Sequence, residues 1–409
     1  MERSYPTLFV TPKAQNSLVQ GHPWVYDTEI VSIDGEDRLT SGCLADVRAA
    51  KGNAYLGTGF FSPQSKIRVR LLSRNANDRF DEAFFRRRIQ WAWDYRRTVM
   101  GGDISACRVI FGEADGLPGL TVDRYGDILV TQTLSVGIER LKPLLFPLLC
   151  EVLESDGSRI AGIFERNDVA IRALEGLEQN KGWYPLAGRP FPASAETEIT
   201  ENGVRYLVDV ENGQKTGFFL DQKYNRAAVA RIAKGRKVLD CCTHTGSFAL
   251  NALRGGAESV TAVDVSEDAL TLARENAVRN GFESRMDFLC EDIFDLLPRL
   301  AAEHAHYDMI ILDPPAFTKS RRTATDAERG YHEINYRAMK LLPRGGYLAT
   351  CSCSHFMEPA RFEKMLLSAA HDAAVSLKRI EVRGASPDHP VLMGVPETEY
   401  LKFWLVQIV

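Results

Sequence analysis

Several familiar signals are missing from this chain of 409 residues. No apolar run approaches the roughly 20 residues that a membrane-spanning helix needs, and the first residues contain no apolar core of a secretion signal. The eight cysteines show no CxxC spacing, so no zinc knuckle is expected. These absences predict a cytoplasmic protein with reduced thiols, no bound metal and no membrane partner.

A strong excess of positive charge is also missing. The net charge of −4 gives no global argument for nucleic-acid binding, so only a local patch could provide one. Arginines alternate with aromatic residues between positions 84 and 97. This pattern favours an amphipathic helix with aromatics in the core, and RNA contacts along Arg68, Arg70 and the arginines of 86–97 are the alternative.

The length predicts two or three domains. Residues 1–73 contain short strands separated by turns, which indicates a small β domain. Residues 74–190 mix strands and helices without the spacing of a parallel sheet, so an α+β domain is expected. A segment rich in Gly, Pro and Ala at 181–197 is predicted to be a domain boundary or linker, and residues 191–409 are expected to form the third domain.

The third domain alternates strands and helices regularly, which predicts an α/β fold of the Rossmann-like, doubly wound kind. The expected strands cover 204–210, 237–240, 259–264, 286–290, 307–312 and 346–350, and the expected helices 222–234, 247–254, 267–280, 293–304 and 329–342.

Acidic residues stand at the ends of three successive strands of this domain: Asp240, Asp264 and Asp292. The loop after Asp240 contains Thr245 and Gly246 and lacks both G-x-G-x-x-G and the P-loop motif. An acid after the second strand suits a ribose diol, and one after the third suits an adenine amino group. Each acid alone is more often a helix cap, but in this order they favour S-adenosylmethionine (SAM), with NAD as the second choice.

The segment before the first alternating unit offers further cofactor contacts. Gly217 can turn beside a ligand, Phe218 can cover an adenine or a sulfonium, and Asp221 and Gln222 can form hydrogen bonds. A helix cap at Asp221 explains the spacing equally well.

Two strand ends carry side chains that suit catalysis, a carboxylate at one and thiols at the other. Asp313 and Pro314 follow one apolar strand, and Cys351 and Cys353 follow the next. A thiolate that adds to C6 of cytosine makes C5 nucleophilic, and a carboxyl group such as that of Asp313 can bind the N3 edge of the ring. Phe317 offers a stacking face for an extruded base. Spacing alone does not choose between the two cysteines.

The chain resembles the bacterial and archaeal 23S rRNA 5-methylcytosine methyltransferases over its whole length. The resemblance is carried by Gly21–Tyr26, Gly112–Arg124, Lys215–Gln222, Asp313–Phe317 and Ser352–Ser354. It implies an N-terminal RNA-binding PUA domain, a SAM site that uses Asp313 and Pro314 among others, and a ribosomal RNA substrate. It also selects Cys353, in Ser-Cys-Ser, as the nucleophile.

One position departs from related RNA 5-methylcytosine enzymes. Those enzymes carry a second cysteine where this chain has Pro315, so the group that removes the C5 proton stays open. The 7-methylguanine rRNA methyltransferases share Asp-Pro-Pro but have no later cysteine, and they are the nearest rivals. A SAM-sensing RNA-binding protein without activity is a third reading. The sequence does not decide whether the chain forms a homodimer.

Overall fold

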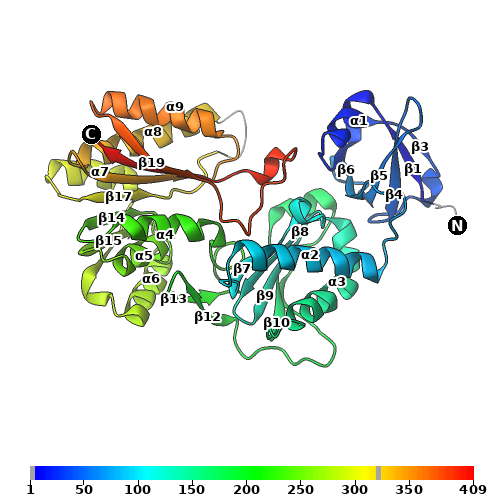
Figure 1. The fold of residues 1–409 in the computed structure, drawn as a ribbon, viewed down its shortest axis with the longest axis horizontal. Helices are drawn as coiled ribbons and strands as arrows, with labels where there is room; N and C mark the ends of the chain where they lie inside the picture. The colour runs from blue at the N-terminus through cyan, green and yellow to red at the C-terminus, as the bar shows by residue number, and fades with distance from the viewer. Residues whose placement is uncertain (1–4, 319–323) are drawn as a thin grey trace. The chain divides into compact units, whose positions relative to one another are not determined.

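The computed structural model describes residues 5–318 and 324–409. The chain divides into two compact units (Figure 1). The first comprises Met1–Ile199, Val208–Phe218 and Pro387–Thr398, and the second Thr200–Leu207, Phe219–Ser386 and Glu399–Val409. Among the described residues, no helix is both long and apolar enough to cross a membrane.

The first unit begins with a six-stranded sheet in the order β2-β6-β5-β4-β1-β3. Its strands surround a small core that includes Leu8, Val25, Val47 and Val69, all with 0% exposure. The elements are β1 (Thr7–Val10), α1 (Pro12–Val19), β2 (Trp24–Tyr26), β3 (Ile30–Asp34), β4 (Leu44–Ala49), β5 (Tyr55–Phe61) and β6 (Ile67–Ser73).

Helix α1 shows that the expectation of strands alone was wrong for this region. The Thr11 side chain accepts a hydrogen bond from the backbone N–H of Ala14, and Pro12 occupies the first turn. Both are helix-start signals, but eight residues are too few for a clear helical period.

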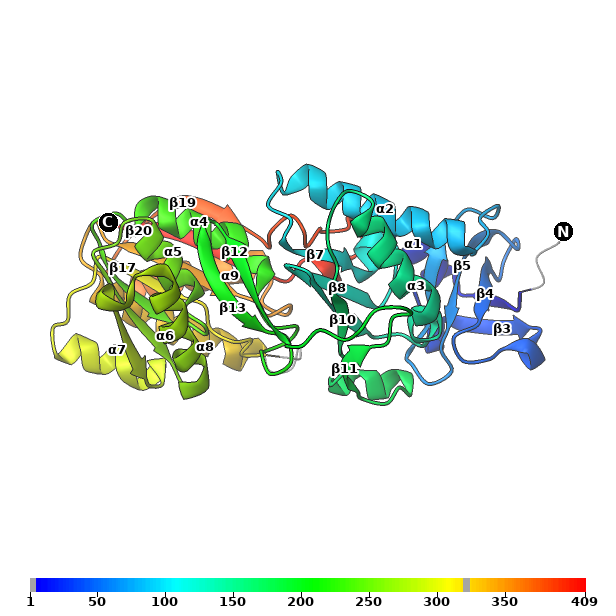
Figure 2. The ribbon, with the colours of Figure 1, turned by 90° about the horizontal axis from the view of Figure 1, so that it is seen from below.

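A five-stranded sheet follows in the order β11-β10-β9-β8-β7. Helices α2 and α3 pack against each other beside it (Figure 1), so the α+β prediction for this region is confirmed. Residues 181–184 form an edge strand paired with β10, so the linker prediction was wrong there. The elements are α2 (Glu82–Val99), β7 (Ala106–Phe111), β8 (Leu120–Tyr125), β9 (Ile128–Thr133), α3 (Val136–Glu154), β10 (Gly162–Arg166) and β11 (Lys181–Tyr184). Strands β12 (Glu196–Glu201) and β13 (Val204–Asp209) form a separate two-stranded ribbon (Figure 2).

The second unit contains a seven-stranded sheet in the order β16-β15-β14-β17-β18-β20-β19. The first five of these are parallel, and β20 is antiparallel to both neighbours. The elements are α4 (Lys223–Ile232), β14 (Lys237–Cys241), α5 (Ser247–Arg254), β15 (Ser259–Asp264), α6 (Glu267–Asn280), β16 (Met286–Cys290), α7 (Ile293–Ala302), β17 (Met309–Leu312), α8 (Ala324–Leu341), β18 (Tyr347–Ser352), α9 (Pro359–Asp372), β19 (Leu377–Arg383) and β20 (Lys402–Ile408).

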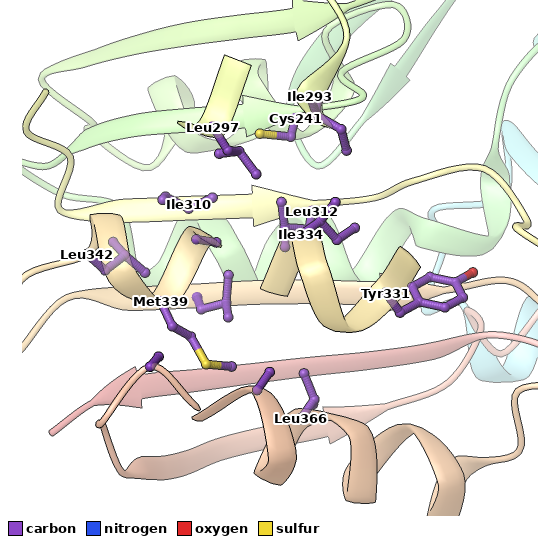
Figure 3. Packing of buried hydrophobic residues seen from close by; sticks show 14 of the residues in the cluster. Cys241, Ile293, Leu297, Ile310, Leu312, Tyr331, Ile334, Met339, Leu342 and Leu366 are labelled. Atoms are coloured by element: carbon purple, nitrogen blue, oxygen red, sulfur yellow. The ribbon is translucent and has the colours of Figure 1, made fainter. Parts of the chain in front are cut away.

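Helices cover both faces of this sheet (Figure 1), which confirms the α/β prediction. Helices α7, α8 and α9 bury apolar side chains on one face, and α4, α5 and α6 lie on the other. Figure 3 shows the first layer, in which Ile310 and Leu312 of β17 lie among Leu297, Ile334 and Met339. Because β14 to β18 run parallel, their carboxyl ends meet at one edge, where open α/β sheets hold ligands.

Candidate active site

The loop after β14 has an unusual backbone. Cys242 and His244 adopt left-handed conformations with φ of 62° and 52°, and Gly246 follows with φ of 81°. Such conformations cost non-glycine residues on the order of 1 kcal/mol or more, and they cluster where a backbone is shaped for a ligand. The loop then enters α5, whose first residue is Ser247.

Asp240 lies at the base of this loop and is fully buried. Its Oδ2 accepts hydrogen bonds from the Thr243 hydroxyl at 2.6 Å and the Ala249 backbone N–H at 2.9 Å. Burial raises the pKa of Asp240 to about 7. Within the described residues, Oδ1 of Asp240 and the buried Oγ1 of Thr245 have no hydrogen-bond partner. Since buried polar atoms are nearly always paired, both are open to a ligand.

The other two predicted acids occupy different surroundings. Asp264 is half-buried and accepts from the backbone N–H groups of His244 at 2.8 Å and Ser266 at 3.0 Å. This holds the carboxylate against the loop after β14. Asp292 is exposed and caps α7 through the N–H of Phe294, which is the structural role that spacing alone suggested.

Asp221 and Gln222 lie in a short 3-10 turn, Leu220–Gln222, before α4. The Asp221 carboxylate accepts from the Tyr400 hydroxyl at 2.6 Å, and no side-chain cap is formed at the start of α4. Gln222 is buried and donates from Nε2 to Oδ1 of Asp313 at 2.9 Å. The capping explanation for Asp221 is therefore wrong, and Gln222 contacts the predicted catalytic carboxylate.

Phe218 belongs to the first unit. It is 4% exposed, and its backbone N–H donates to the Tyr125 hydroxyl at 3.2 Å. A role over the cofactor stays a prediction for this residue.

Asp313 follows β17 and is partly exposed. Burial, followed by the charge of Asp221, raises its pKa to about 6. Pro314, the next residue, is buried. The Phe317 ring packs against Tyr331 of α8, with 4.6 Å between centroids, and its role as a stacking face for a base stays a prediction.

The two cysteines of the second motif differ in burial. Cys351 lies inside β18 with no exposure, and burial raises its pKa well above the ordinary value. Strand β18 ends at Ser352, so Cys353 lies just beyond it, and Cys353 is half-buried. A thiol that is inaccessible and hard to ionise is a poor nucleophile, so the geometry favours Cys353.

Three polar residues at this edge were not predicted. Tyr331 shares a hydrogen bond with the Ser354 hydroxyl at 3.0 Å, Tyr400 holds Asp221, and Lys402 donates to the Ser354 carbonyl oxygen at 2.6 Å. Tyr400 and Lys402 come from a segment to which the sequence reading assigned no element. The apolar run 403–406 was the available signal for a buried strand there.

The arginine-rich helix α2 is mainly a core element. Arg96 is fully buried and pairs with both oxygens of Asp115 at 2.5 and 2.8 Å, so its predicted RNA contact is wrong. Arg86 pairs with Glu82 and Glu151. Arg87 is more open, with the Trp91 ring 5.5 Å from its guanidinium carbon. The Trp91 side chain is 56% exposed.

Arg68 and Arg70 already have protein partners. Arg68 donates to the Ser62 carbonyl oxygen. Arg70 forms ion pairs with Glu113 and Glu175 at 3.4 and 3.0 Å. The charge of Arg70 is therefore already neutralised by carboxylates, whereas Arg68 is held by carbonyl oxygens.

The carboxylates at the sheet edge suit a cationic ligand. The charges of Asp313 and Asp264 both contribute to the raised pKa of Asp240, so the three acids repel one another when ionised. A positively charged ligand with N–H donors would relieve this repulsion and pair the open oxygen of Asp240. Within residues 5–318 and 324–409, no group of three or more His, Cys, Asp or Glu residues could hold a metal ion.

Comparison with known proteins gives matches over nearly the whole chain. The family described as S-adenosylmethionine-dependent methyltransferase matches residues 181–403, and a PUA-like domain matches residues 8–74. Proteins named ribosomal RNA large subunit methyltransferase I are similar to it. The one from Klebsiella pneumoniae strain 342 is 38% identical over 97% of both chains. The one from Aliivibrio fischeri strain ES114 is 39% identical over 98% of this chain and 99% of its own.

Two solved structures share the fold. One is described as a SAM-dependent methyltransferase from Streptococcus mutans, with a TM-score of 0.80 and 22% identity, covering 98% of this chain and 99% of that one. The other is described as a methyltransferase complexed with S-adenosylhomocysteine (SAH), with a TM-score of 0.80, 21% identity and the same coverage.

Proposed function

The chain belongs to the ribosomal RNA large subunit methyltransferase I family of SAM-dependent methyltransferases, and on that premise we propose that it methylates C5 of a cytosine in 23S rRNA through a covalent adduct with Cys353. The observation that carries the proposal is the half-buried thiol of Cys353 beyond the end of β18, one strand away from Asp313.

The edge of the sheet provides the cofactor site. SAM, the cofactor of this family, supplies a methyl group on a positively charged sulfur. In our proposal Asp240, Thr245 and Gly246 bind its amino-acid end, since these residues contain the open polar atoms and the close-approach glycine. Asp264 binds the ribose and Asp292 the adenine amino group, as their order along the sheet suggests.

Residues around Asp313 complete this site. Gln222 donates to Asp313, and Asp221 accepts from Tyr400; in our proposal both residues also bind the cofactor. Pro314 fixes the backbone that follows the Asp313 carboxylate. Phe218 covers the cofactor in this proposal.

Cys353 performs the covalent step. Its thiolate forms a bond to C6 of the cytosine, which shifts electrons to C5 and makes that carbon nucleophilic. After methylation a base takes the C5 proton, and the electrons of that C–H bond re-form the C5–C6 double bond and expel the Cys353 thiolate. Asp313 binds the N3 edge, where a carboxyl group with a pKa of about 6 can accept or donate a hydrogen bond near neutral pH.

Ribosomal RNA is the proposed substrate. An unassembled or partly assembled rRNA would expose the base more readily, because extrusion from a duplex costs a few kcal/mol. We propose that residues 1–73 bind RNA, that 74–190 form the central domain and that 191–409 carry the catalysis. Homodimer formation is compatible with this arrangement, and no step of the mechanism requires it.

One experiment separates this proposal from its rivals. The protein is incubated with unmethylated rRNA and labelled SAM, and the product is identified by mass spectrometry. We expect 5-methylcytosine from the wild type and none from Cys353→Ala. Cys351→Ala is the matched control, because it removes a neighbouring but buried thiol, and its product should persist.

Two results would overturn the proposal. A 7-methylguanine product that survives Cys353→Ala would point to nitrogen methylation, which needs no thiol. The absence of any product, with RNA and SAM binding intact, would point to a SAM-sensing RNA-binding protein.

A further inference from the structure

Lys402 is a buried lysine at the first position of β20. It is 4% exposed, and in the antiparallel pairing of β20 with β18 it lies opposite Ser352. Its side chain therefore reaches the Ser352–Ser354 segment that carries the proposed nucleophile. Lysines are almost never fully buried unless a partner compensates the charge.

The ammonium group is held by two carbonyl oxygens. Nζ of Lys402 donates to the Ser354 oxygen at 2.6 Å and to the Tyr400 oxygen at 2.7 Å. Across residues 5–318 and 324–409, no carboxylate oxygen lies within ion-pairing distance of it. The Lys402 ammonium is thus held by the dipoles of two carbonyl groups, and neither of these partners carries a full negative charge.

Among the described residues, Tyr331 of α8 and Cys351 of β18 also interact electrostatically with Cys353. The charge of Asp313 acts on Cys351, and Glu399 acts on Lys402 from its own segment. Of these named groups, Lys402 is the cation. Burial lowers its pKa to about 8, and a negative charge on Cys353 acts in the opposite direction. By reciprocity, the positive charge of Lys402 favours the ionised thiol.

We propose that Lys402 is the counter-ion that stabilises the Cys353 thiolate and, through its bond to the Ser354 carbonyl, a positioning residue for that sulfur. The catalytic use of this thiolate rests on the proposed function, but the ionisation of Cys353 needs neither RNA nor SAM. The thiol proton passes to solvent, and Lys402 is mostly protonated below its pKa of about 8.

The test measures the ionisation of Cys353 directly. The full-length protein is alkylated with iodoacetamide between pH 6 and pH 10, and the rate at Cys353 is followed by peptide mass spectrometry. The exposed thiol of Cys290 on the same chain is the internal reference. Lys402→Met should move the midpoint for Cys353 upward by about one pH unit or more, which is roughly a tenfold loss of reactivity at pH 7.

Lys402→Arg keeps the charge and should leave the midpoint within a few tenths of a unit of the wild type, while Cys290 should not change in any variant. If Lys402→Met does not fold, Lys402→Gln serves instead, since its amide keeps a donor for the Ser354 carbonyl. Superimposable Cys353 profiles for the wild type and a folded neutral variant would overturn the proposal.

Methylation assays then separate this inference from the proposed function. With 5-methylcytosine as the product, the neutral variant should lose about tenfold in rate at pH 7 and recover part of it at pH 9. If the neutral variant shifts the alkylation profile but the wild type makes no 5-methylcytosine, the counter-ion role of Lys402 is supported and the proposed function is rejected.

Discussion

If Asp240 and Asp313 bind the cofactor as proposed, its binding should depend on pH. Burial is the largest cause of both raised pKa values, which are about 7 and about 6. Below these values the carboxyl groups are neutral, and above them they are negative. Because SAM is positively charged at sulfur, its affinity should rise as the pH increases from 5.5 to 8, by about tenfold for one full charge at close range.

Titration calorimetry at several pH values measures this effect. SAH lacks the sulfonium charge, so its affinity should change less over the same range. Asp240→Asn and Asp313→Asn should each flatten the SAM curve, whereas Asp292→Asn, on an exposed carboxylate, should weaken binding without flattening it. Equal slopes for SAM and SAH would contradict the electrostatic argument.

At the residue scale, the sequence identified groups that stand in recognisable motifs. Asp240, Asp264 and Asp313 were predicted as site residues because each stands at or just after the end of an apolar strand. Lys402 and Tyr331 were not found, because their importance comes from contacts with Ser354, 48 and 23 positions away. No local pattern encodes a pairing that only the sheet and helix packing bring about.

The loop between β14 and α5 gives a prediction at the scale of the element. Gly246 has a φ of 81°, and an added Cβ would lie 3.1 Å from Met286 and 3.2 Å from Ala273. Gly246→Ala should therefore lower the free energy of unfolding by roughly 1–2 kcal/mol and should also weaken SAM binding, because the loop must shift.

Gly281→Ala is the matched control. This glycine ends α6 with a φ of 69° and has open space around the added Cβ. It should lose a similar amount of stability without any change in SAM affinity. Urea unfolding and calorimetry test both variants, and a parallel loss of SAM affinity in the two would show that the loop after β14 has no special role.

Strand β17 connects the core to the active site. Leu312 is fully buried between the helices of Figure 3 and immediately precedes Asp313. Leu312→Ala should cost about 2–5 kcal/mol of stability through the cavity that it leaves. Thermal unfolding should show a lower midpoint, and saturating SAM should recover part of the loss through binding linkage. A change below 0.5 kcal/mol would mean that the site can collapse around the missing side chain.

Elements with a clear period were predictable, and short or edge elements were not. The helices at 247–254 and 267–280 have the predicted bounds, since the βα alternation defines them. Helix α1 and strand β11 were missed because eight and four residues leave little periodic signal. Strand β20 was missed because it is antiparallel and interrupts the alternation.

At the scale of the whole molecule, the arginine-rich segment shows what composition alone could not decide. Its charges and aromatics favoured an amphipathic helix with aromatics in the core and left a nucleic-acid surface as the alternative. The structure places Phe84, Phe85 and Trp93 in the core and Arg96 in a buried ion pair. Which arginines face solvent without a close acidic partner depends on residues distant in sequence, such as Glu151 and Asp115.

RNA binding by a chain of net charge −4 must rely on such local positive charge. Arg87 is the best candidate on α2, because its nearest carboxylate oxygen, on Asp78, is 3.8 Å away and its guanidinium lies over the exposed Trp91 ring. Arg86 lies one residue away with similar exposure, but carboxylates of Glu82 and Glu151 lie at 3.2 and 2.6 Å from its guanidinium.

If Arg87 binds a phosphate, Arg87→Ala should reduce the slope of log affinity against log salt by about 0.9 for a duplex region or about 0.7 for a single strand. Arg86→Ala should leave the slope unchanged, because its charge is already neutralised. Filter binding of a 23S rRNA fragment between 50 and 300 mM KCl measures both slopes. A slope that changes equally in the two variants would assign the effect to general charge, and an unchanged slope in both would remove this face of α2 from the RNA path.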